Sequence, residues 1–87
     1  MKFIYKIYIP TNPSIPHVLI RKRITNHFDG FTQYEAKGSW LGLVENVHVY
    51  EIITSNHQPN VLQSIKQDML DAGEEEVLIT IDSITTF

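Results

Sequence analysis

The sequence predicts a small α+β domain whose elements follow the order β-α-β-β-α-β. Three observations support this prediction. Four stretches are rich in β-branched and aromatic residues, as strands are, and residues of alternating positions can be assigned to opposite faces. Two stretches between them repeat apolar residues every three to four positions, as amphipathic helices do. Glycine, proline and asparagine gather in the connections between these stretches, where turns need them.

The length and composition fit one folded domain. With 87 residues the chain can bury one small core, so residues 1–87 are expected to form a single domain. Hydrophobic residues make up 43% and charged residues 20%, which is an ordinary balance for a folded protein. The net charge is −3, and the one tight basic cluster, Arg21-Lys22-Arg23, is too small to follow several phosphates. Nucleic acid is therefore not expected as a partner.

The expected cellular location depends on the N-terminal stretch, because the lack of cysteine leaves the compartment open. The chain has no cysteine, which excludes disulfides and thiolate metal sites. The apolar N-terminal stretch is interrupted by Lys6 and is too short for a signal peptide core or a membrane span. We therefore expect no membrane partner and a cytoplasmic location.

The first strand and helix follow from the N-terminal pattern. A strand is expected over Lys2–Ile9, because apolar and aromatic residues fill nearly every position. A helix is expected over His17–Phe28, because apolar residues recur there at every fourth position from Ile20. Gly30 then offers the left-handed conformation with which many helices end.

A hairpin is expected in the middle of the chain. Its strands are predicted over Phe31–Lys37 and Leu43–Ile53, joined by a bend through Gly38-Ser39-Trp40-Leu41-Gly42. The two glycines allow positive φ angles on either side of the large Trp40 ring.

The remaining elements complete a ferredoxin-like arrangement. A helix is expected from Pro59, with an apolar stripe from Val61 to Met69, and Gly73 is expected to end it. A last strand is expected over Val77–Ile84. This order predicts an antiparallel sheet with both helices on one face.

The face without helices is expected to be apolar. From the alternation within the strands it is expected to carry Ile4, Tyr8, Tyr34, Tyr50, Ile52 and Leu78. Such a surface is too apolar to remain in water, so self-association as a dimer or a closed ring is expected.

The hairpin carries the side chains best suited to chemistry. Glu45, expected close to Tyr34 across the hairpin, suits a base or an ammonium-binding carboxylate; an edge carboxylate in water is the alternative. Tyr34 suits a hydrogen bond to a substrate or a contact between subunits. Trp40 suits stacking on a purine or packing against a neighbouring subunit.

The histidines do not predict a metal site. Four are spread along the chain without the clustered spacing of metal ligands, so no metal is expected. His48 lies in the hairpin and is interpreted either as a polar sheet residue or as a substrate contact. A Ser-His-Asp order with a glycine elbow and a phosphate-binding glycine loop are both absent from the sequence.

The sequence resembles two broad groups of small proteins. One resemblance, to an uncharacterised family of small bacterial domains, implies no activity. It rests on the run Asp29-Gly30-Phe31-Thr32, then Ala36, Gly38 and Trp40, then Glu45 or Glu51, and after a helix Val77-Leu78 and Phe87. The layout is similar to the trimeric nitrogen-regulatory PII-like proteins, which bind nucleotides in clefts between subunits. The long loop and the glycine-lysine pattern of true PII proteins are missing, so a signalling role is not implied.

A third resemblance implies an activity. Glu35 and Glu45 lie on either side of the bend, Tyr34 precedes it, and Glu76 leads into Val77-Leu78. These features resemble phage-encoded S-adenosylmethionine (SAM) lyases, also described as SAM hydrolases. These enzymes are PII-like trimers that degrade SAM to methylthioadenosine and homoserine lactone. The resemblance implies a phage-type protein in the host cytoplasm that needs no cofactor. The residues that it implies are catalytic Glu45 and Tyr34, with Trp40, Tyr50, His48 and Glu35 binding the substrate.

Three functions stay open at this point. The first is a homotrimeric SAM lyase that acts at subunit interfaces. The second is a PII-like module that binds a small molecule such as an adenine nucleotide without catalysis. The third is a dimeric ferredoxin-like oxygenase or a purely structural interaction domain.

Overall fold

The computed structural model describes residues 1–74 and 76–85, and at Trp40 the backbone alone. The chain folds in the order expected, βαββαβ. The elements are β1 (Lys2–Pro10), α1 (His17–His27), β2 (Thr32–Trp40), β3 (Leu43–Thr54), α2 (Pro59–Asp71) and β4 (Leu78–Ile84).

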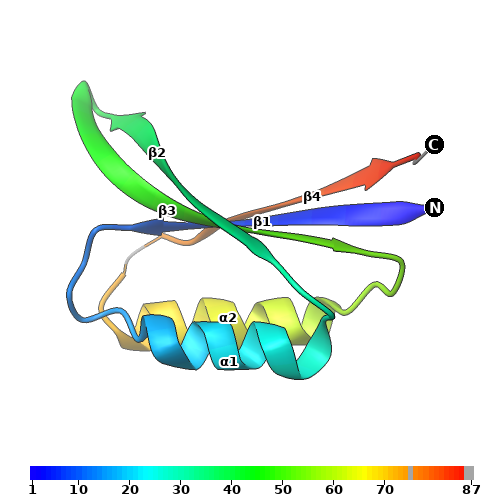
Figure 1. The fold of residues 1–87 in the computed structure, drawn as a ribbon. Helices are drawn as coiled ribbons and strands as arrows, with labels where there is room; N and C mark the ends of the chain where they lie inside the picture. Colours follow the sequence, from blue (N-terminus) through cyan, green and yellow to red (C-terminus); the bar gives the residue numbers. More distant parts are fainter. Residues whose placement is uncertain (75, 86–87) are drawn as a thin grey trace.

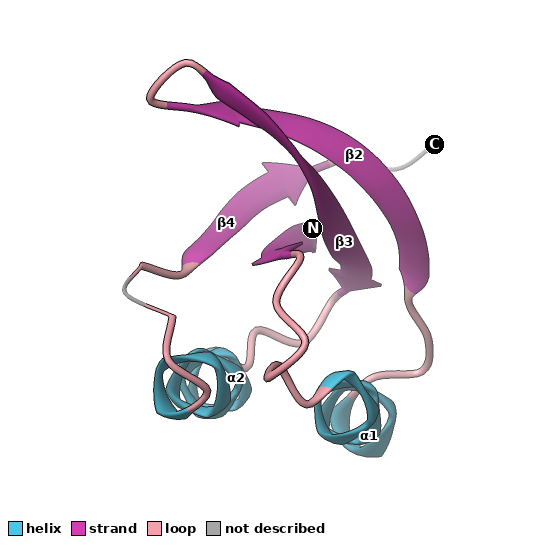
Figure 2. Ribbon diagram, turned by 90° about the vertical axis from the view of Figure 1, so that its left-hand side faces the viewer, coloured by secondary structure: helices cyan, strands magenta, loops and turns pink. Residues whose placement is uncertain are grey.

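The strands form one antiparallel sheet in the order β2-β3-β1-β4. Figure 1 shows α1 and α2 side by side beneath this sheet, and Figure 2 shows the same two layers end on. The predicted ferredoxin-like α+β fold is therefore confirmed. One face of the sheet packs on the helices, and we refer to the other as the open face.

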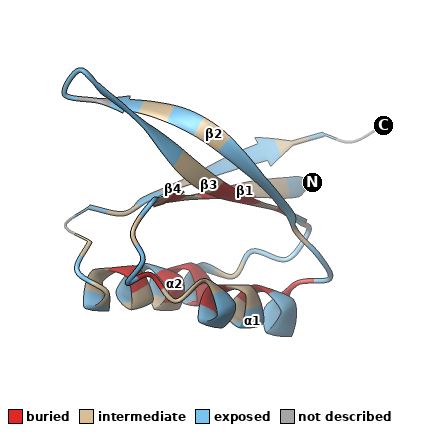
Figure 3. Cartoon of the chain, turned by 60° about the vertical axis from the view of Figure 1, so that its left-hand side comes forward, coloured by how far each residue is buried: buried red, intermediate tan, exposed pale blue. Residues whose placement is uncertain are grey.

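The core lies between the sheet and the helices (Figure 3). β1 contributes Tyr5, Ile7 and Ile9, which alternate along the strand and are all fully buried. Ile20 and Ile24 of α1 meet them from below, as the four-residue spacing predicts. On α2 the buried residues are Val61, Leu62, Ile65 and Met69.

The ends of the two helices differ from each other. α1 ends at His27, and its C-cap Phe28 is extended with φ −131°, so the expected left-handed ending at Gly30 is wrong. α2 ends as predicted at Gly73, which has φ 99°. There the Gly73 N–H donates to Leu70 O (3.0 Å) and the Glu74 N–H donates to Met69 O (3.2 Å). This bonding pattern is a Schellman motif, which fixes the direction in which the chain leaves the helix.

The two helices are also joined by an ion pair. The Arg23 guanidinium donates two hydrogen bonds to the Asp68 carboxylate, one of them from Nη2 to Oδ1 at 3.1 Å. The hydrogen bond to Asp68 is the main cause that raises the pKa of Arg23. One member of the basic cluster is thus used within the fold.

The hairpin turn is tighter than the sequence suggested. β2 continues through Trp40, and only Leu41 and Gly42 lie in the turn, with φ 51° and 79°. Positive φ at both central residues is typical of a type I′ turn, whose twist matches the right-handed twist of paired strands. The predicted five-residue bend is therefore corrected to two residues.

This turn sets the register between β2 and β3. Tyr34 pairs with Val49, and Val49 pairs in turn with Tyr8 of β1. Cross-strand partners share a face, so the open face carries Tyr34, Val49 and Tyr8 together. Tyr50 and Ile52 were expected on the open face. They lie instead on the face that packs on the helices and are fully buried in the core. The expectation failed because alternation groups the residues within a strand but does not say which group faces the helices.

The apolar residues of the open face differ in their exposure to solvent. Ile4, Tyr8, Tyr34 and Leu78 lie on it as predicted. Leu78 is 58% exposed, whereas Val49 is fully buried although no helix covers this face.

None of the helices in residues 1–74 and 76–85 is long and apolar enough to cross a membrane.

The end of the hairpin projects beyond the rest of the sheet. β1 reaches only as far as Val47, so residues 43–46 of β3 pair with β2 alone. In Figure 1 the end of the hairpin rises away from the helices. Leu41 at its tip is 89% exposed.

Candidate functional site

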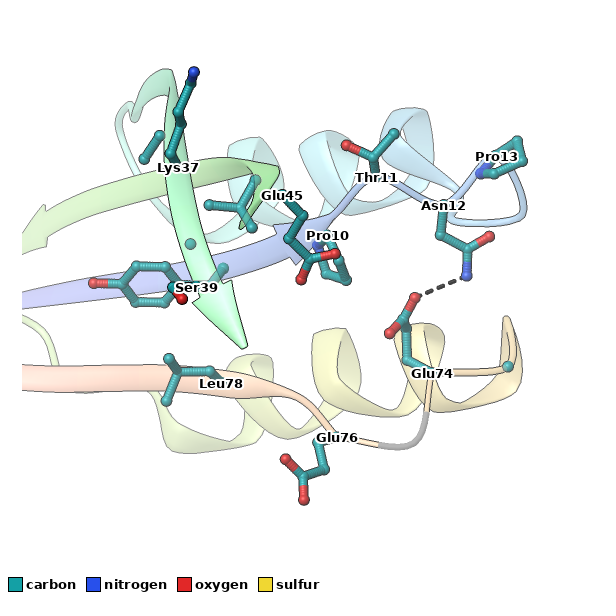
Figure 4. A pocket seen from close by; sticks show the side chains of 15 residues that line it. Pro10, Thr11, Asn12, Pro13, Lys37, Ser39, Glu45, Glu74, Glu76 and Leu78 are labelled. Carbon is teal, nitrogen blue, oxygen red and sulfur yellow. Dashed lines mark hydrogen bonds between the residues drawn. The ribbon is translucent and has the colours of Figure 1, made fainter. Parts of the chain in front are cut away.

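A broad cavity of about 840 Å³ lies on the open face, between the hairpin and the start of β4 (Figure 4). Its apolar lining comes mainly from the sheet and includes Tyr8, Pro10, Ala36, Val47 and Leu78. Loops close the other side, since Asn12 of the β1–α1 connection and Glu74 of the α2–β4 connection also line it. The cavity thus combines an apolar floor with a polar rim.

The rim of the cavity is mainly acidic. Glu45 of β3 and Glu74 of the connection between α2 and β4 line it, and Glu76 of the same connection borders its edge with the carboxylate directed away from both (Figure 4). Lys37 of β2 is the lysine that lines the cavity within the described residues. Three carboxylates against one ammonium favour a ligand with positive charge.

The register set by the tight turn places Glu45 of β3 on the open face. Its cross-strand partner is Gly38, which has no side chain, and the Glu45 residue is exposed. The carboxylate therefore borders the cavity with free space beside it, as Figure 4 shows. This arrangement leaves room for a ligand group to reach the carboxylate.

Glu74 is held more firmly than Glu45. Its Oε1 accepts a hydrogen bond of 2.8 Å from Nδ2 of Asn12, drawn as a dashed line in Figure 4. Asn12 is itself fixed, because its Oδ1 accepts from the Ser14 N–H at 2.9 Å. Its carbonyl oxygen accepts from the Ile15 N–H at 3.1 Å. Two loops that are 62 residues apart in the chain are joined by this contact.

Tyr34 is separate from Glu45, contrary to the expectation that the two would be close. The Tyr34 hydroxyl donates to Glu51 Oε2 at 3.2 Å. Glu45 and the Tyr34 partner Val49 are four residues apart on β3, which places them about 13 Å apart along the strand. Desolvation, with a smaller effect of Glu51, raises the pKa of the Tyr34 phenol. The phenol that lines the cavity is that of Tyr8.

Three of the expected substrate-binding residues lie on the opposite face. His48 and Glu35 are cross-strand partners, with Nε2 and Oε1 3.9 Å apart. Tyr50 is buried in the core, where its hydroxyl is 3.0 Å from His17 Nδ1 and accepts from Arg21 Nη1 at 3.3 Å. The sheet therefore separates this group from Glu45.

On the helix side of the sheet, His48 and Tyr50 of β3 form a polar cluster with His17 and Arg21 of α1. The His17 and His48 rings are 5.3 Å apart between centroids, in an edge-to-face arrangement. Burial, followed by the charges of His48 and Arg21, lowers the pKa of His17. Among residues 1–74 and 76–85, no three histidine and carboxylate groups come together as a metal site would require.

Trp40 is placed only through its backbone. It pairs with Leu43 immediately before the turn, so it lies at the end of the hairpin. Its expected role in stacking on a ligand stays a prediction.

The cavity also contains residues that the sequence interpretation missed. No functional role was expected for Asn12 or Glu74 from the sequence. The signal for Asn12 was its place in Asn-Pro-Ser, where an asparagine side chain commonly binds the backbone two residues on. Sequence offers no corresponding signal for the contact with Glu74, because that contact depends on how two distant loops meet.

Comparison with solved structures places this domain in a structural class. Its element order, sheet order and helix placement are those of ferredoxin-like domains of the PII-like type. The sequence matches no protein-family model and no curated protein.

Three solved structures show the likeness. A phage SAM lyase in complex with S-methyl-5′-thioadenosine has a TM-score of 0.64 and 16% identity, over 93% of this chain and 80% of that chain. The PII-like protein CutA from a Nostoc species, in apo form, has a TM-score of 0.55 and 18% identity, over 97% and 81%. The periplasmic divalent cation tolerance protein CutA from Archaeoglobus fulgidus has a TM-score of 0.51 and 13% identity, over 100% and 87%. At these identities the likeness establishes a shared fold.

Proposed function

We propose that this protein is a SAM lyase that converts SAM into methylthioadenosine and homoserine lactone in the open-face cavity. The observation that carries the proposal is the cavity itself, in which carboxylates surround an apolar floor. SAM matches that pattern, because it joins a cationic amino-acid part to an aromatic nucleoside. The structural likeness to a phage SAM lyase bound to S-methyl-5′-thioadenosine supports the same assignment.

The reaction asks the protein for orientation rather than for a cofactor. A carboxylate oxygen of the methionyl part attacks the γ-carbon, and the bond from that carbon to the sulfonium breaks. The bonding electrons go to sulfur, so methylthioadenosine leaves as a neutral thioether and the five-membered lactone retains the ammonium. No proton has to move, and holding the two reacting atoms in line is worth several kcal/mol by itself.

The charge on each part of SAM suggests which cavity residues bind it. The positive charge on sulfur disappears during the reaction, so a carboxylate against it would stabilise the substrate more than the transition state. The ammonium keeps its charge throughout. We therefore assign the Glu45 carboxylate to the ammonium and the apolar surface of Tyr8, Val47 and Leu78 to the sulfonium and its neighbours.

The remaining candidate residues take more distant roles in this proposal. Tyr34, on the open face outside the cavity, is assigned to a contact between subunits of a trimer. Trp40 is assigned to stacking on the adenine from the hairpin end. His48, Glu35 and Tyr50 are left out, because the sheet stands between them and Glu45.

Trimer formation is proposed from the surface that the helices leave bare. Ile53 and Leu78 on the open face are 53% and 58% exposed, and Ile4 lies on the same surface. Copies that cover this surface would bury it and enclose the cavity between chains.

Incubation of the purified protein with SAM tests the proposed reaction. Chromatography should show methylthioadenosine and homoserine lactone in equal amounts, and Glu45→Gln should reduce their rate of formation. If no product forms, or if Glu45→Gln matches the wild-type rate at SAM concentrations below the KM, the proposal is wrong.

A second function is a PII-like module that binds an adenine nucleotide without catalysis. The likeness to a CutA described as PII-like favours it. A nucleotide that raises the melting temperature and is recovered unchanged would select this function over the lyase.

A further inference from the structure

We propose that Glu74, oriented by Asn12, is the second carboxylate that binds the ammonium of the ligand, opposite Glu45. This inference rests on the proposed SAM chemistry and extends it to the specificity of the same cavity. Asn12 acts as a positioning residue, because it reaches the ligand only through Glu74.

The backbone of Glu74 is set by the end of α2. The Schellman motif holds its N–H on Met69 O, and Gly73 at φ 99° turns the chain towards the cavity. Glu74 is therefore presented from a helix end rather than from a free loop. A carboxylate on such a support loses little freedom when a ligand binds.

The side chain of Glu74 is set by a second chain of contacts. Oε1 is occupied by the Asn12 amide, and the Ser14 N–H donates to the opposite atom of that amide. Because a backbone N–H requires an acceptor, Oδ1 of Asn12 must face Ser14 and Nδ2 must face Glu74. Within the described residues, Oε2 of Glu74 has no hydrogen-bond partner, which leaves it for a ligand donor.

Glu74 differs from the other two carboxylates in its surroundings. It is half-buried, whereas Glu45 and Glu76 are exposed. Water screens an exposed charge more strongly than a half-buried one. Figure 4 shows Glu45 and Glu74 entering the cavity from different walls, one from the hairpin and one from the α2–β4 connection. A primary ammonium has three N–H donors, so it can bind both carboxylates at once.

The test compares a cationic and a neutral ligand on the same proteins. SAM carries the ammonium and the sulfonium, whereas S-methyl-5′-thioadenosine lacks both charges and keeps the nucleoside. Calorimetry should show that Glu74→Gln weakens SAM binding about tenfold or more, with unchanged binding of the thioadenosine. Asp71→Asn removes an exposed carboxylate at the last residue of α2, outside the cavity lining, and should change neither affinity.

Asn12 is tested through the split between KM and kcat. Asn12→Ala should raise the KM for SAM about fivefold, because Glu74 is no longer oriented, and should leave kcat within about twofold. Glu74→Gln combined with Asn12→Ala should be no worse than Glu74→Gln alone. Circular dichroism and melting curves establish that each variant is folded before its affinity is interpreted.

The outcomes separate this inference from the proposed function. If SAM is turned over and Glu74→Gln binds it as tightly as the wild type, the role of Glu74 is wrong and the lyase stands. If SAM binds unchanged but is not consumed, and Glu74→Gln weakens it, the lyase is wrong and the role of Glu74 stands. If the wild type binds neither ligand, both are wrong.

Discussion

Gly38 faces Glu45 across the β2–β3 hairpin, so the Glu45 carboxylate has no side chain beside it on β2. A Cβ placed at Gly38 would meet Val47 Cγ1 at 3.7 Å, which is an ordinary contact. Its φ lies outside the left-handed region, so the backbone accepts other residues there. The absence of a side chain at Gly38 thus leaves space beside Glu45 rather than relieving strain.

Substitutions at Gly38 should therefore separate folding from ligand binding. Gly38→Ala should fold with equal or higher stability, by up to about 1 kcal/mol in urea unfolding, because alanine restricts the unfolded chain. Gly38→Leu should also fold but fill the space beside Glu45, with a loss of SAM affinity of about tenfold or more in calorimetry. Unchanged affinity in Gly38→Leu would mean that ligands bind elsewhere.

Glu45→Gln should lower kcat/KM for SAM by about tenfold or more, mainly through a higher KM, because the neutral amide loses its charge-assisted contact with an ammonium whose charge does not change during the reaction. Glu45 is exposed and makes no hydrogen bond within the described residues, so the melting temperature should stay within about 2 °C. Product formation followed by chromatography measures the first effect and a thermal melt the second. Asp29→Asn, an exposed carboxylate in the α1–β2 connection, is the matched control and should retain full activity.

Stability should fall as the pH is lowered through about 6.5, the ordinary pKa of histidine, partly because of His17. Burial and the nearby His48 and Arg21 lower the pKa of His17 in the folded protein, so the unfolded chain takes up the proton first. This contribution is fully present above the unfolded pKa and is lost as the pH falls towards the folded pKa. Urea midpoints at several pH values measure it.

His17→Gln isolates the contribution of His17 from those of the other ionisable groups of the protein. Its loss of stability between pH 7.5 and 5.5 should be smaller than that of the wild type. An equal loss in both proteins would show that His17 does not contribute.

Leu41→Asn should stabilise the protein by about 0.5 to 1 kcal/mol, because leucine at φ 51° is strained and asparagine tolerates that conformation. The leucine side chain is 89% exposed, so little packing is lost in a single chain. Urea unfolding at low protein concentration measures the change. A decrease in stability would instead indicate that another copy buries the hairpin tip.

Ile53→Asp should shift the protein towards smaller species in size-exclusion chromatography with light scattering. The isoleucine is 53% exposed on the open face, and a charge there would oppose burial of that face by another copy. Val18→Asp introduces the same charge at a 64% exposed position on α1, away from the sheet, and should leave the mass unchanged. Equal masses for the wild type and both variants would place the subunit contact elsewhere.

The sequence predicted the elements and the residues that share a face within each strand. Apolar spacing identified the buried Ile20 and Ile24, and alternation correctly paired Glu45 with Val49 on β3. Alternation divides the β3 residues between two faces of the sheet. It did not reveal which of these faces also carries Tyr34, because both contain apolar residues of β3. That choice depends on the turn: a two-residue loop at Leu41 and Gly42 sets Tyr34 against Val49, and a one-residue change would reverse it.

The candidate site was predicted less completely than the fold. Glu45 was found because it follows a glycine bend, and it does line a cavity. Tyr8 was expected on the correct face but had no assigned role. The contact between Asn12 and Glu74 joins positions 62 residues apart, and no local pattern encodes such a meeting of loops.

Val49 has a consequence for how a ligand and the subunits come together. It is shielded from water on the face that has no helix, with Tyr8 and Tyr34 as its cross-strand neighbours. A single chain therefore already shields this part of the open face, without contacts from other copies. We expect a dilute, dissociated subunit to bind a small molecule already, so that ligand binding does not depend on association of the copies.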